Sequence, residues 1–366
     1  MTDDLLYQIA LTMAENIGDI RAKALIAIYG DAKSIFKAPL KQLAKVEGVG
    51  MLAAQGIKHF ADFKTCEEEV SFIEKYNIRP LLLVNDDYPR RLLNCYDSPS
   101  LLYYKGTADL NTDRIISIVG TRRNSEYGKA ACEKIIEDLQ EENILIVSGL
   151  AYGIDSISHR AALQNNLATV AVVAHGLDRI YPPVNKQLAK EMILHGGILT
   201  DFRSFTNPDR QNFPRRNRIV AGVCDALVVV ESNIKGGSLI TAEIANSYNK
   251  DIFAVPGRIS DACSSGCNYL IKANKASLVT DAQDILKMMN WKETKSVEKK
   301  LQRQLFVELT DNERIITNVL TTVDSMQIDG LVSRCNLSSG NMAEALLMLE
   351  MQGIIQSLPG KCYRLL

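Results

Sequence analysis

Several loops of this sequence combine residue types that bind phosphate groups. Each loop follows an apolar run and joins glycine to a hydroxyl or a cationic side chain. Glycine lets an anion come close to the backbone, the start of the next helix offers free N–H groups, and arginine or lysine supplies the opposite charge. The loop residues that we expect to contact phosphate are Gly120, Thr121, Arg122, Ser148, Gly149, Lys235, Gly237 and Ser238.

A dense cationic stretch lies between Arg203 and Arg218. It holds five arginines against a single acid, Asp209. Arginine can grip phosphate oxygens through two parallel hydrogen bonds, and an interleaved aromatic ring can stack on an unpaired base. Because acids are scarce nearby, the pattern favours phosphate binding over its alternative, the start of a salt-bridged surface helix. The candidate residues are Phe213, Arg215, Arg216, Asn217 and Arg218.

The same loops give no sign of a cofactor or a metal. They match neither the dinucleotide fingerprint nor the Walker A loop, so we expect no cofactor. Cys263 and Cys267 form a CxxxC, but no second pair or nearby histidine completes a tetrahedral zinc site.

Apolar runs that alternate with helical stretches must position the candidate loops. The runs predicted to be buried parallel strands are 115–119, 144–147, 169–174, 226–230 and 252–255. Helices are predicted between them, for example at 129–141 and 185–194. This alternation predicts an α/β fold with a Rossmann-like, mainly parallel sheet covered by helices on both faces. Ligands bind beyond the carboxyl ends of such strands, so the candidate loops should converge there.

The chain is too long for a single ordinary core. We expect a helical domain at 1–65, a connecting segment at 66–110, a Rossmann-like DNA-binding domain at 111–290, a charged linker at 291–307 and a winged-helix domain at 308–366. The first contains Glu47-Gly48-Val49-Gly50 between two helices, which resembles a helix-hairpin-helix unit but also suits an ordinary packing domain. The recognition helix of the last, at 339–351, has no lysine or arginine, which favours a structural or protein-contact role.

An enzyme acting on a nucleotide is the main functional alternative. Rossmann-like folds with a G-G-x-x-T loop include N-glycosidases, and here Asp155 and Glu243 would supply the acids. Asp155 is better explained as a helix N-cap and Glu243 as a helix-surface residue. His159 is more typical of a packed side chain than of a catalytic one. We therefore expect a DNA-binding protein rather than an enzyme.

Composition narrows the class of protein further. The formal net charge is −1, so any nucleic-acid surface must be local. No apolar run approaches the ~18 to 20 residues that span a bilayer, and the acidic start is unlike a secretory signal. The eight cysteines are then best explained as reduced thiols of a cytoplasmic protein.

Taken together, the motifs resemble those of one family. V-G-T-R, V-S-G-L-A-x-G-I-D-x-x-x-H, Y-P-P-x-N, F-P-R-R-N-R-I-V-A-G, G-G-S-L-I-T-A and F-A-V-P-G occur in order over about residues 80–285. This run is similar to the DNA-processing family called DprA or Smf. The family often has arginine where this chain has Tyr152, so one cation is absent.

The resemblance implies a function. Members bind single-stranded DNA on the Rossmann-like domain, dimerise, and load the RecA recombinase onto incoming DNA during natural transformation. We therefore expect single-stranded DNA, RecA and a second copy of the chain as partners, with no membrane.

Overall fold

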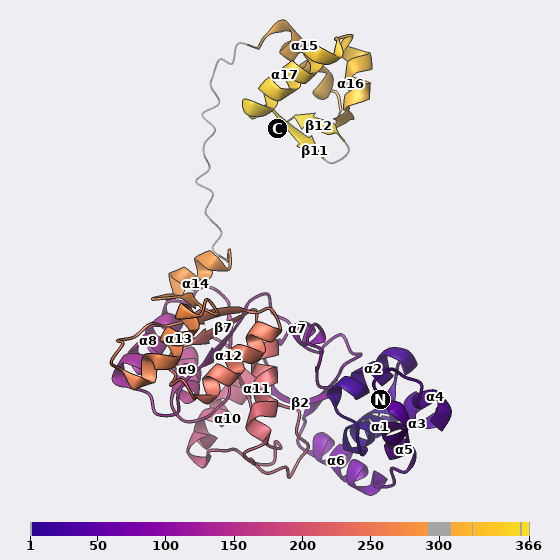
Figure 1. The fold of residues 1–366 in the computed structure, drawn as a ribbon, viewed down its shortest axis with the longest axis vertical. Coiled ribbons are helices and arrows are strands. Elements are labelled where there is room, and N and C mark those ends of the chain that lie inside the picture. Colours follow the sequence, from indigo (N-terminus) through magenta and orange to yellow (C-terminus); the bar gives the residue numbers. More distant parts are fainter. Residues whose placement is uncertain (1, 292–308, 324, 359–360, 366) are drawn as a thin grey trace. The chain divides into compact units, whose positions relative to one another are not determined.

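The computed structural model describes residues 2–291, 309–323, 325–358 and 361–365. The chain divides into two compact units, Met1–Trp291 and Lys292–Leu366 (Figure 1). Among the described residues no helix is long and apolar enough to cross a membrane.

The first unit is built on a nine-stranded sheet with the order β1-β2-β6-β5-β4-β3-β7-β8-β9. The strands from β6 to β9 in this order pair in parallel, whereas β2 pairs antiparallel with both β6 and β1. The strands are β1 (Arg79–Leu82), β2 (Leu101–Gly106), β3 (Ile115–Val119), β4 (Leu145–Ser148), β5 (Thr169–Val172), β6 (Gly196–Thr200), β7 (Ala226–Val229), β8 (Asp251–Ala254) and β9 (Ser277–Leu278).

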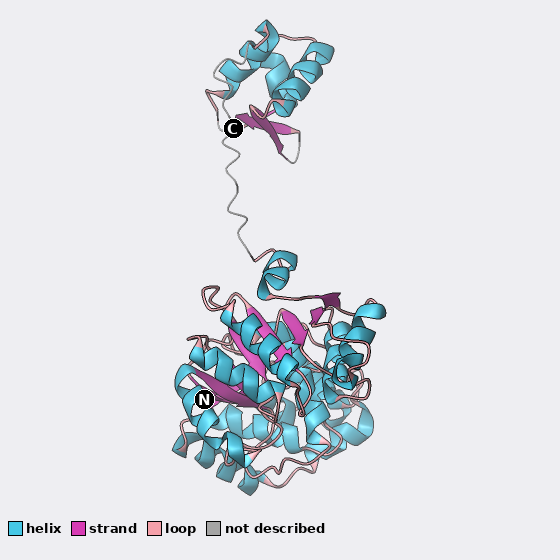
Figure 2. Ribbon diagram, turned by 90° about the vertical axis from the view of Figure 1, so that its left-hand side faces the viewer, coloured by secondary structure: helices cyan, strands magenta, loops and turns pink. Residues whose placement is uncertain are grey.

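Helices cover both faces of this sheet, as Figure 2 shows. Alternate residues of each strand point to opposite faces. On β3, Ile116 and Ile118 belong to a core with α8 (Glu126–Glu137), α9 (Ile154–Gln164) and α14 (Ala282–Met288). Ile115 and Val119 belong to the other core, with α11 (Asn212–Gly222), α12 (Gly237–Ser247) and α13 (Ser265–Lys272). A further helix, α10 (Lys186–His195), packs on β5 and β6. The expected Rossmann-like fold with helices on both faces is confirmed.

Four strands of the sheet, β1, β2, β6 and β9, lie outside the five runs predicted to be buried parallel strands. Of these, β6 contains Gly196 and Gly197 and so lacks the β-branched enrichment typical of strands. The strand β2 follows Pro99 and extends the sheet in the antiparallel direction. Both β2 and β6 are stabilised by pairing with neighbours that are distant in the sequence.

The N-terminal helices share a core with the sheet. They are α1 (Thr2–Met13), α2 (Asp19–Tyr29), α3 (Ala32–Lys37), α4 (Leu40–Leu43), α5 (Gly50–Lys58) and α6 (Phe63–Lys75), followed later by the short α7 (Arg90–Leu93). Ile9 of α1 and Ile73 of α6 pack with Leu101 and Tyr103 of β2. The boundary expected between residues 65 and 66 therefore falls inside α6, because that helix is needed to close this core.

The second unit has the winged-helix arrangement. Its elements are α15 (Asp311–Leu320), β10 (Met326–Gln327), α16 (Ile328–Cys335), α17 (Ser339–Met351), β11 (Ile355–Leu358) and β12 (Cys362–Leu365). The strands form a sheet of order β10-β12-β11, and Leu331, Leu346 and Ile355 are buried between helices and sheet. The expected C-terminal winged helix is confirmed.

A candidate nucleic-acid interface at the carboxyl edge of the sheet

A cleft of about 800 Å³ opens beyond the carboxyl ends of β3, β4 and β7. The chain runs from β3 outward through β4, β5 and β6, and then returns to place β7 on the other side of β3. The loops after β3 and β7 therefore diverge, and open α/β sheets bind ligands at such a switch point. The sequence-predicted residues that line the cleft are Gly120, Thr121, Arg122, Gly149, Phe213, Arg216, Asn217, Gly237 and Ser238.

The charge of the cleft is strongly positive. Among its described lining residues, the cations are Arg122, Arg123, Arg210 and Arg216, and the one acid is Asp155. The guanidinium of Arg122 lies 5.0 Å from the ring centroid of Phe213, so a cation and an aromatic ring stand together on the wall. Tyr181 extends this aromatic wall, with its ring centroid 6.3 Å from that of Phe213.

A buried carboxylate holds the loop after β3 in place. Glu231 follows β7, and its Oε2 accepts a hydrogen bond from the backbone N–H of Ser125 at 2.9 Å. The backbone carbonyl of Glu231 accepts from the N–H of Thr121 at 2.8 Å. Gly120 is required at this turn, because a Cβ there would lie 2.5 Å from the side chain of Ile154. These contacts fix the loop that carries Arg122.

Arg216 is a buried cation beneath the floor of the cleft. Its Nη1 donates to the carbonyl oxygens of Gly149, at 2.5 Å, and of Val172. Burial lowers the pKa of Arg216 to about 10, with Asp155 opposing that shift, so the guanidinium stays charged at neutral pH. A cation in such a dry site is screened less than one on the surface.

Two helices begin at the cleft without a side chain capping their first N–H groups. One is α11, and the other is α12, which follows Gly236. A Cβ on Gly237 would meet nothing within 4 Å, so the start of α12 is open to an approaching ligand. Uncapped N–H groups and the helix dipole together attract anions. The cleft thus offers arginines, open backbone donors and an aromatic wall to a polyanion.

Comparison with known proteins matches this part of the chain to a family. A sequence model described as "DNA recombination-mediator protein A" matches residues 79–290, more than half of the chain, and one described as "DprA winged helix domain" matches residues 304–361. The chain belongs to the DNA recombination-mediator protein A family. The resemblance to DprA or Smf proteins seen in the motifs is confirmed.

Individual DprA and Smf proteins are similar over much of their length. "Protein Smf" of Synechocystis is 30% identical over 98% of each chain. The X-ray structure of DprA from Streptococcus pneumoniae is 34% identical, with a TM-score of 0.68, covering 77% of this chain and 97% of that one. A Helicobacter pylori DprA, whose structure addresses its single-stranded DNA binding mode, is 28% identical with a TM-score of 0.54, covering 59% and 96%.

In this member of the DprA family, the cationic stretch does not act as one patch. Arg218 is buried, and its Nη2 lies 2.7 Å from Oδ2 of Asp201 and 2.9 Å from Oδ2 of Asp19. Arg215 lies over the ring of Phe202, 5.2 Å from its centroid, and faces away from the cleft. Of the candidate cations, Arg122 therefore lines the cleft, whereas the charge of Arg218 is satisfied internally by Asp201 and Asp19.

Two further candidates lie beside the cleft without lining it. The hydroxyl of Ser148 is buried and donates to the carbonyl of Ile118 at 2.6 Å, so it is committed to the fold. Lys235 is exposed on the loop before Gly236, at the rim. The hydroxyl of Ser238, although it lines the cleft, already donates to that of Ser232 at 2.7 Å.

The structure adds cleft residues that were not among the candidates. Arg123, Arg210 and Tyr181 line it. Each stands in a stretch that the sequence had singled out, namely the loop after the first parallel strand, the cationic stretch and the Tyr-Pro-Pro motif. The sequence motifs therefore marked the right segments, but they could not show which side chains of each segment face the cleft.

The acids required by an N-glycosidase are not assembled. Glu243 pairs with Lys275 at 2.7 Å and does not line the cleft. Asp155 lines it but is buried, and it accepts from the backbone N–H of Ala151 at 3.3 Å. It lies in the first turn of α9, which Gly153 caps, so its expected role as N-cap is wrong. His159 is buried against Thr169, with Nδ1 2.7 Å from the hydroxyl oxygen, which is the packing role expected.

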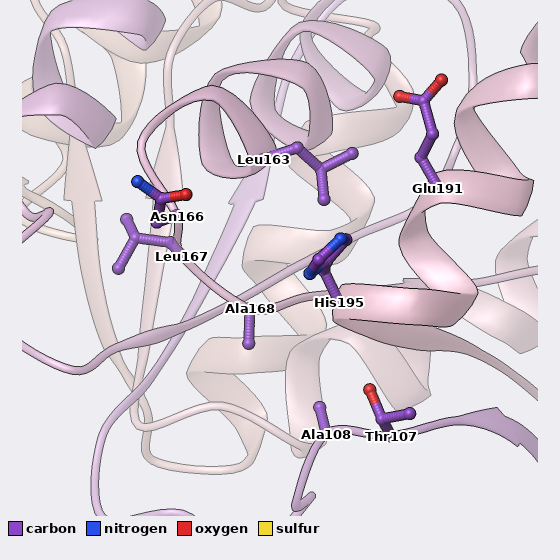
Figure 3. A pocket seen from close by; sticks show the side chains of 8 residues that line it. All are labelled: Thr107, Ala108, Leu163, Asn166, Leu167, Ala168, Glu191 and His195. Atoms are coloured by element: carbon purple, nitrogen blue, oxygen red, sulfur yellow. The ribbon is translucent and has the colours of Figure 1, made fainter.

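Other features of the first unit suit a phosphate ligand less well. A hollow of about 520 Å³ near the start of β5, shown in Figure 3, is lined by Glu191 and His195 but by no lysine or arginine. Among the described residues, no group of three or more histidines, cysteines or carboxylates could hold a metal ion.

Proposed function

We propose that this protein binds single-stranded DNA in the cleft and delivers it to the RecA recombinase during natural transformation. The supporting observation is the union of four arginines, two uncapped helix starts and the Phe213 ring around one cleft that holds a single described acid. Phosphates would lie on the three exposed arginines, Arg122, Arg123 and Arg210, and on the backbone N–H groups, while a base stacks on Phe213. Arg216 would add positive charge from beneath the floor.

Single-stranded DNA suits this site better than duplex DNA does. The aromatic wall and the concave floor accommodate an unpaired base, whereas a duplex keeps its bases stacked inside. The Helicobacter pylori relative bears a description that names single-stranded DNA binding, which supports the same ligand here. The family resemblance also makes RecA and a second copy of the chain the partners to test, in the cytoplasm.

We further propose that the cleft acts without catalysis, since Glu243 is engaged elsewhere and Asp155 is paired inside the fold. Incubating the protein with nucleoside monophosphates should release no free base.

The deciding experiment measures anisotropy of labelled oligo-dT across a salt series. Arg122→Ala should weaken binding at least about tenfold at low salt. Arg90→Ala, which changes an exposed arginine outside the cleft, is the matched control. If both variants bind like the unaltered protein, the cleft is not the DNA site.

A further inference from the structure

A second hollow of the first unit has a different chemistry. An apolar groove of about 750 Å³ lies between α6 and α10, and it shares no lining residue with the cleft. Its floor is aliphatic, with Leu177, Ile180 and Ile193 among the lining side chains. Phe72 and Tyr76 form one wall. Nothing in the proposed DNA site uses this groove.

An exposed phenylalanine stands at the mouth of the groove in a strained backbone. The residue Phe205 is 68% exposed, and its φ is +64°, a conformation that residues other than glycine rarely adopt. Its ring packs edge-on against Phe72, with centroids 5.7 Å apart. Folding gains little from leaving a large apolar ring in water, and strained residues cluster at binding sites.

Two carboxylates hold the backbone of Ser204 and Phe205 in place. Oδ1 of Asp178 accepts a hydrogen bond from the backbone N–H of Phe205 at 2.6 Å. Glu69 of α6 is buried, and its Oε1 accepts from the N–H of Ser204 at 2.9 Å. The ring is therefore presented by a rigid backbone rather than by a loose loop, which lowers the entropic cost of binding a partner to it.

The rim of the groove is positively charged. Its lining cations are Lys75, Lys105, Arg179, Lys186 and Lys190, against the acids Glu68 and Asp178. Asp178 is neutralised by Arg179, with Nε and Oδ2 2.7 Å apart. Lys186 and Lys190 are four residues apart on α10, are exposed, and have no ion-pair partner among the residues that the structure describes. Like charges at this spacing disfavour a helix, so the pair gains nothing from the fold itself.

We propose that this groove docks an acidic peptide segment of a partner protein, with an apolar side chain inserted beside Phe205 and carboxylates facing the lysines. A concave aliphatic floor holds a leucine or phenylalanine side chain, and the surplus of cations complements acids that flank it.

Nucleic acid fits the groove less well. A base needs a flat ring face, but Phe72 meets Tyr76 at 46° and Phe205 at 62°, so these rings pack against one another. Arg179, the one arginine among the described lining residues, is already bound to Asp178 and to Asn207, whose Oδ1 lies 2.5 Å from Nη1.

The test uses the full chain and a short fluorescein-labelled peptide in which a run of aspartates precedes a leucine and a phenylalanine. The peptide should bind saturably. Phe205→Gly removes the ring but keeps the left-handed backbone that glycine adopts freely, and it should weaken peptide binding about tenfold or more. Lys186→Glu with Lys190→Glu should weaken it about tenfold.

Matched controls separate docking from general attraction. Lys129→Glu with Lys287→Glu makes the same charge change at two exposed lysines outside the groove and should alter peptide binding by less than about twofold. A peptide with serines in place of leucine and phenylalanine should bind at least about tenfold more weakly than the parent peptide.

Three results would overturn the proposal. The first is no saturable binding of the acidic peptide. The second is an equal loss of peptide binding in the control pair (Lys129→Glu with Lys287→Glu) and in the groove pair (Lys186→Glu with Lys190→Glu). The third is that Phe205→Gly and the groove pair lose as much oligo-dT binding as peptide binding. That result would make the groove a nucleic-acid surface. The groove pair lies on an exposed helix face, so it tests the groove even if Phe205→Gly disturbs the fold.

Discussion

Arg218 of α11 forms an ion pair with Asp19 of α2, with Nη2 and Oδ2 2.9 Å apart. The pair joins the N-terminal helices to the helix that lines the cleft. Asp201 shares the same guanidinium at 2.7 Å. Burial acts to lower the pKa of Arg218, but Asp201 and Asp19 outweigh it and raise that pKa above its usual value. The arginine therefore stabilises the packing of α2 on α11.

Removal of either acid tests this role. The side chain of Asp201 is 3% exposed and that of Asp19 is 25% exposed. Asp201→Asn therefore removes the more deeply buried of the two negative charges that neutralise the guanidinium. We expect Asp201→Asn to lower the free energy of unfolding by about 3 kcal/mol and Asp19→Asn by about 1 kcal/mol, measured by urea denaturation. Asp209→Asn, at an exposed position, is the control. Equal losses in the two test variants would contradict the assignment.

Replacing Arg122 and replacing Arg218 should have different effects on how the affinity for single-stranded DNA depends on salt concentration. Each phosphate contact contributes about 0.7 to the slope of log affinity against log salt for single strands. Arg122→Ala should reduce the slope by about that amount, because the side chain lines the cleft. Arg218→Ala should destabilise the fold but leave the slope unchanged at temperatures where the protein is folded. A reduced slope of log affinity against log salt in Arg218→Ala would show that Arg218 does contact DNA.

Alanine substitutions at two glycines of the cleft should have different effects, one on stability and the other on DNA binding. A Cβ on Gly149 would collide with the guanidinium of Arg216 and come within 2.5 Å of Oδ2 of Asp155, whereas one on Gly237 meets nothing. Gly149→Ala should lower the free energy of unfolding by about 1 to 3 kcal/mol. Gly237→Ala should leave it within about 0.5 kcal/mol but weaken oligo-dT binding, because the methyl group obstructs the start of α12. Thermal unfolding and anisotropy on the same samples separate the two effects.

His159 should make the fold sensitive to acid. Burial lowers its pKa to about 3 from the ordinary 6.5, with Arg216 and Arg160 adding to the effect. Below pH 6.5 the unfolded chain gains a proton that the folded chain rejects, so stability falls as pH drops towards 3 and is constant above 6.5.

The size of the acid effect can be measured by substitution. Moving from pH 7 to pH 5 should cost about 2 kcal/mol at this residue. His159→Gln removes the titration and keeps a polar partner for Thr169, so it should reduce the loss between these pH values by that amount. His59→Gln, at an exposed histidine, is the control. An undiminished loss in His159→Gln would assign the acid sensitivity to other groups.

The loops of the cleft were predictable because their positions follow from the strands. Gly120 and Gly149 follow apolar runs that form adjacent parallel strands, and parallel strands end at one edge. The motifs also identified the family. In contrast, β2 and β6 are held by pairing with distant segments and so left a weak local signal.

The arginine stretch shows where local pattern was insufficient. Because residues 212–222 form a helix, side chains three or four apart share a face, and this face carries Phe213, Arg216, Asn217 and Val220 into the cleft. Arg215 and Arg218 lie three apart on another face, towards Phe202 and Asp201. Counting the positive charges in the sequence does not distinguish the arginines that line the cleft from those that face away from it.

The sequence was enough to identify the family, the mainly parallel sheet, the winged helix and the loops that form the cleft, because each buried parallel strand and each loop glycine is marked by local residue types. Only the tertiary structure decided which arginines are available to a ligand, because that depends on which neighbours bury each guanidinium. The pairing of Arg218 with Asp19 joins residues that are far apart in the sequence, and no local pattern contains such a contact.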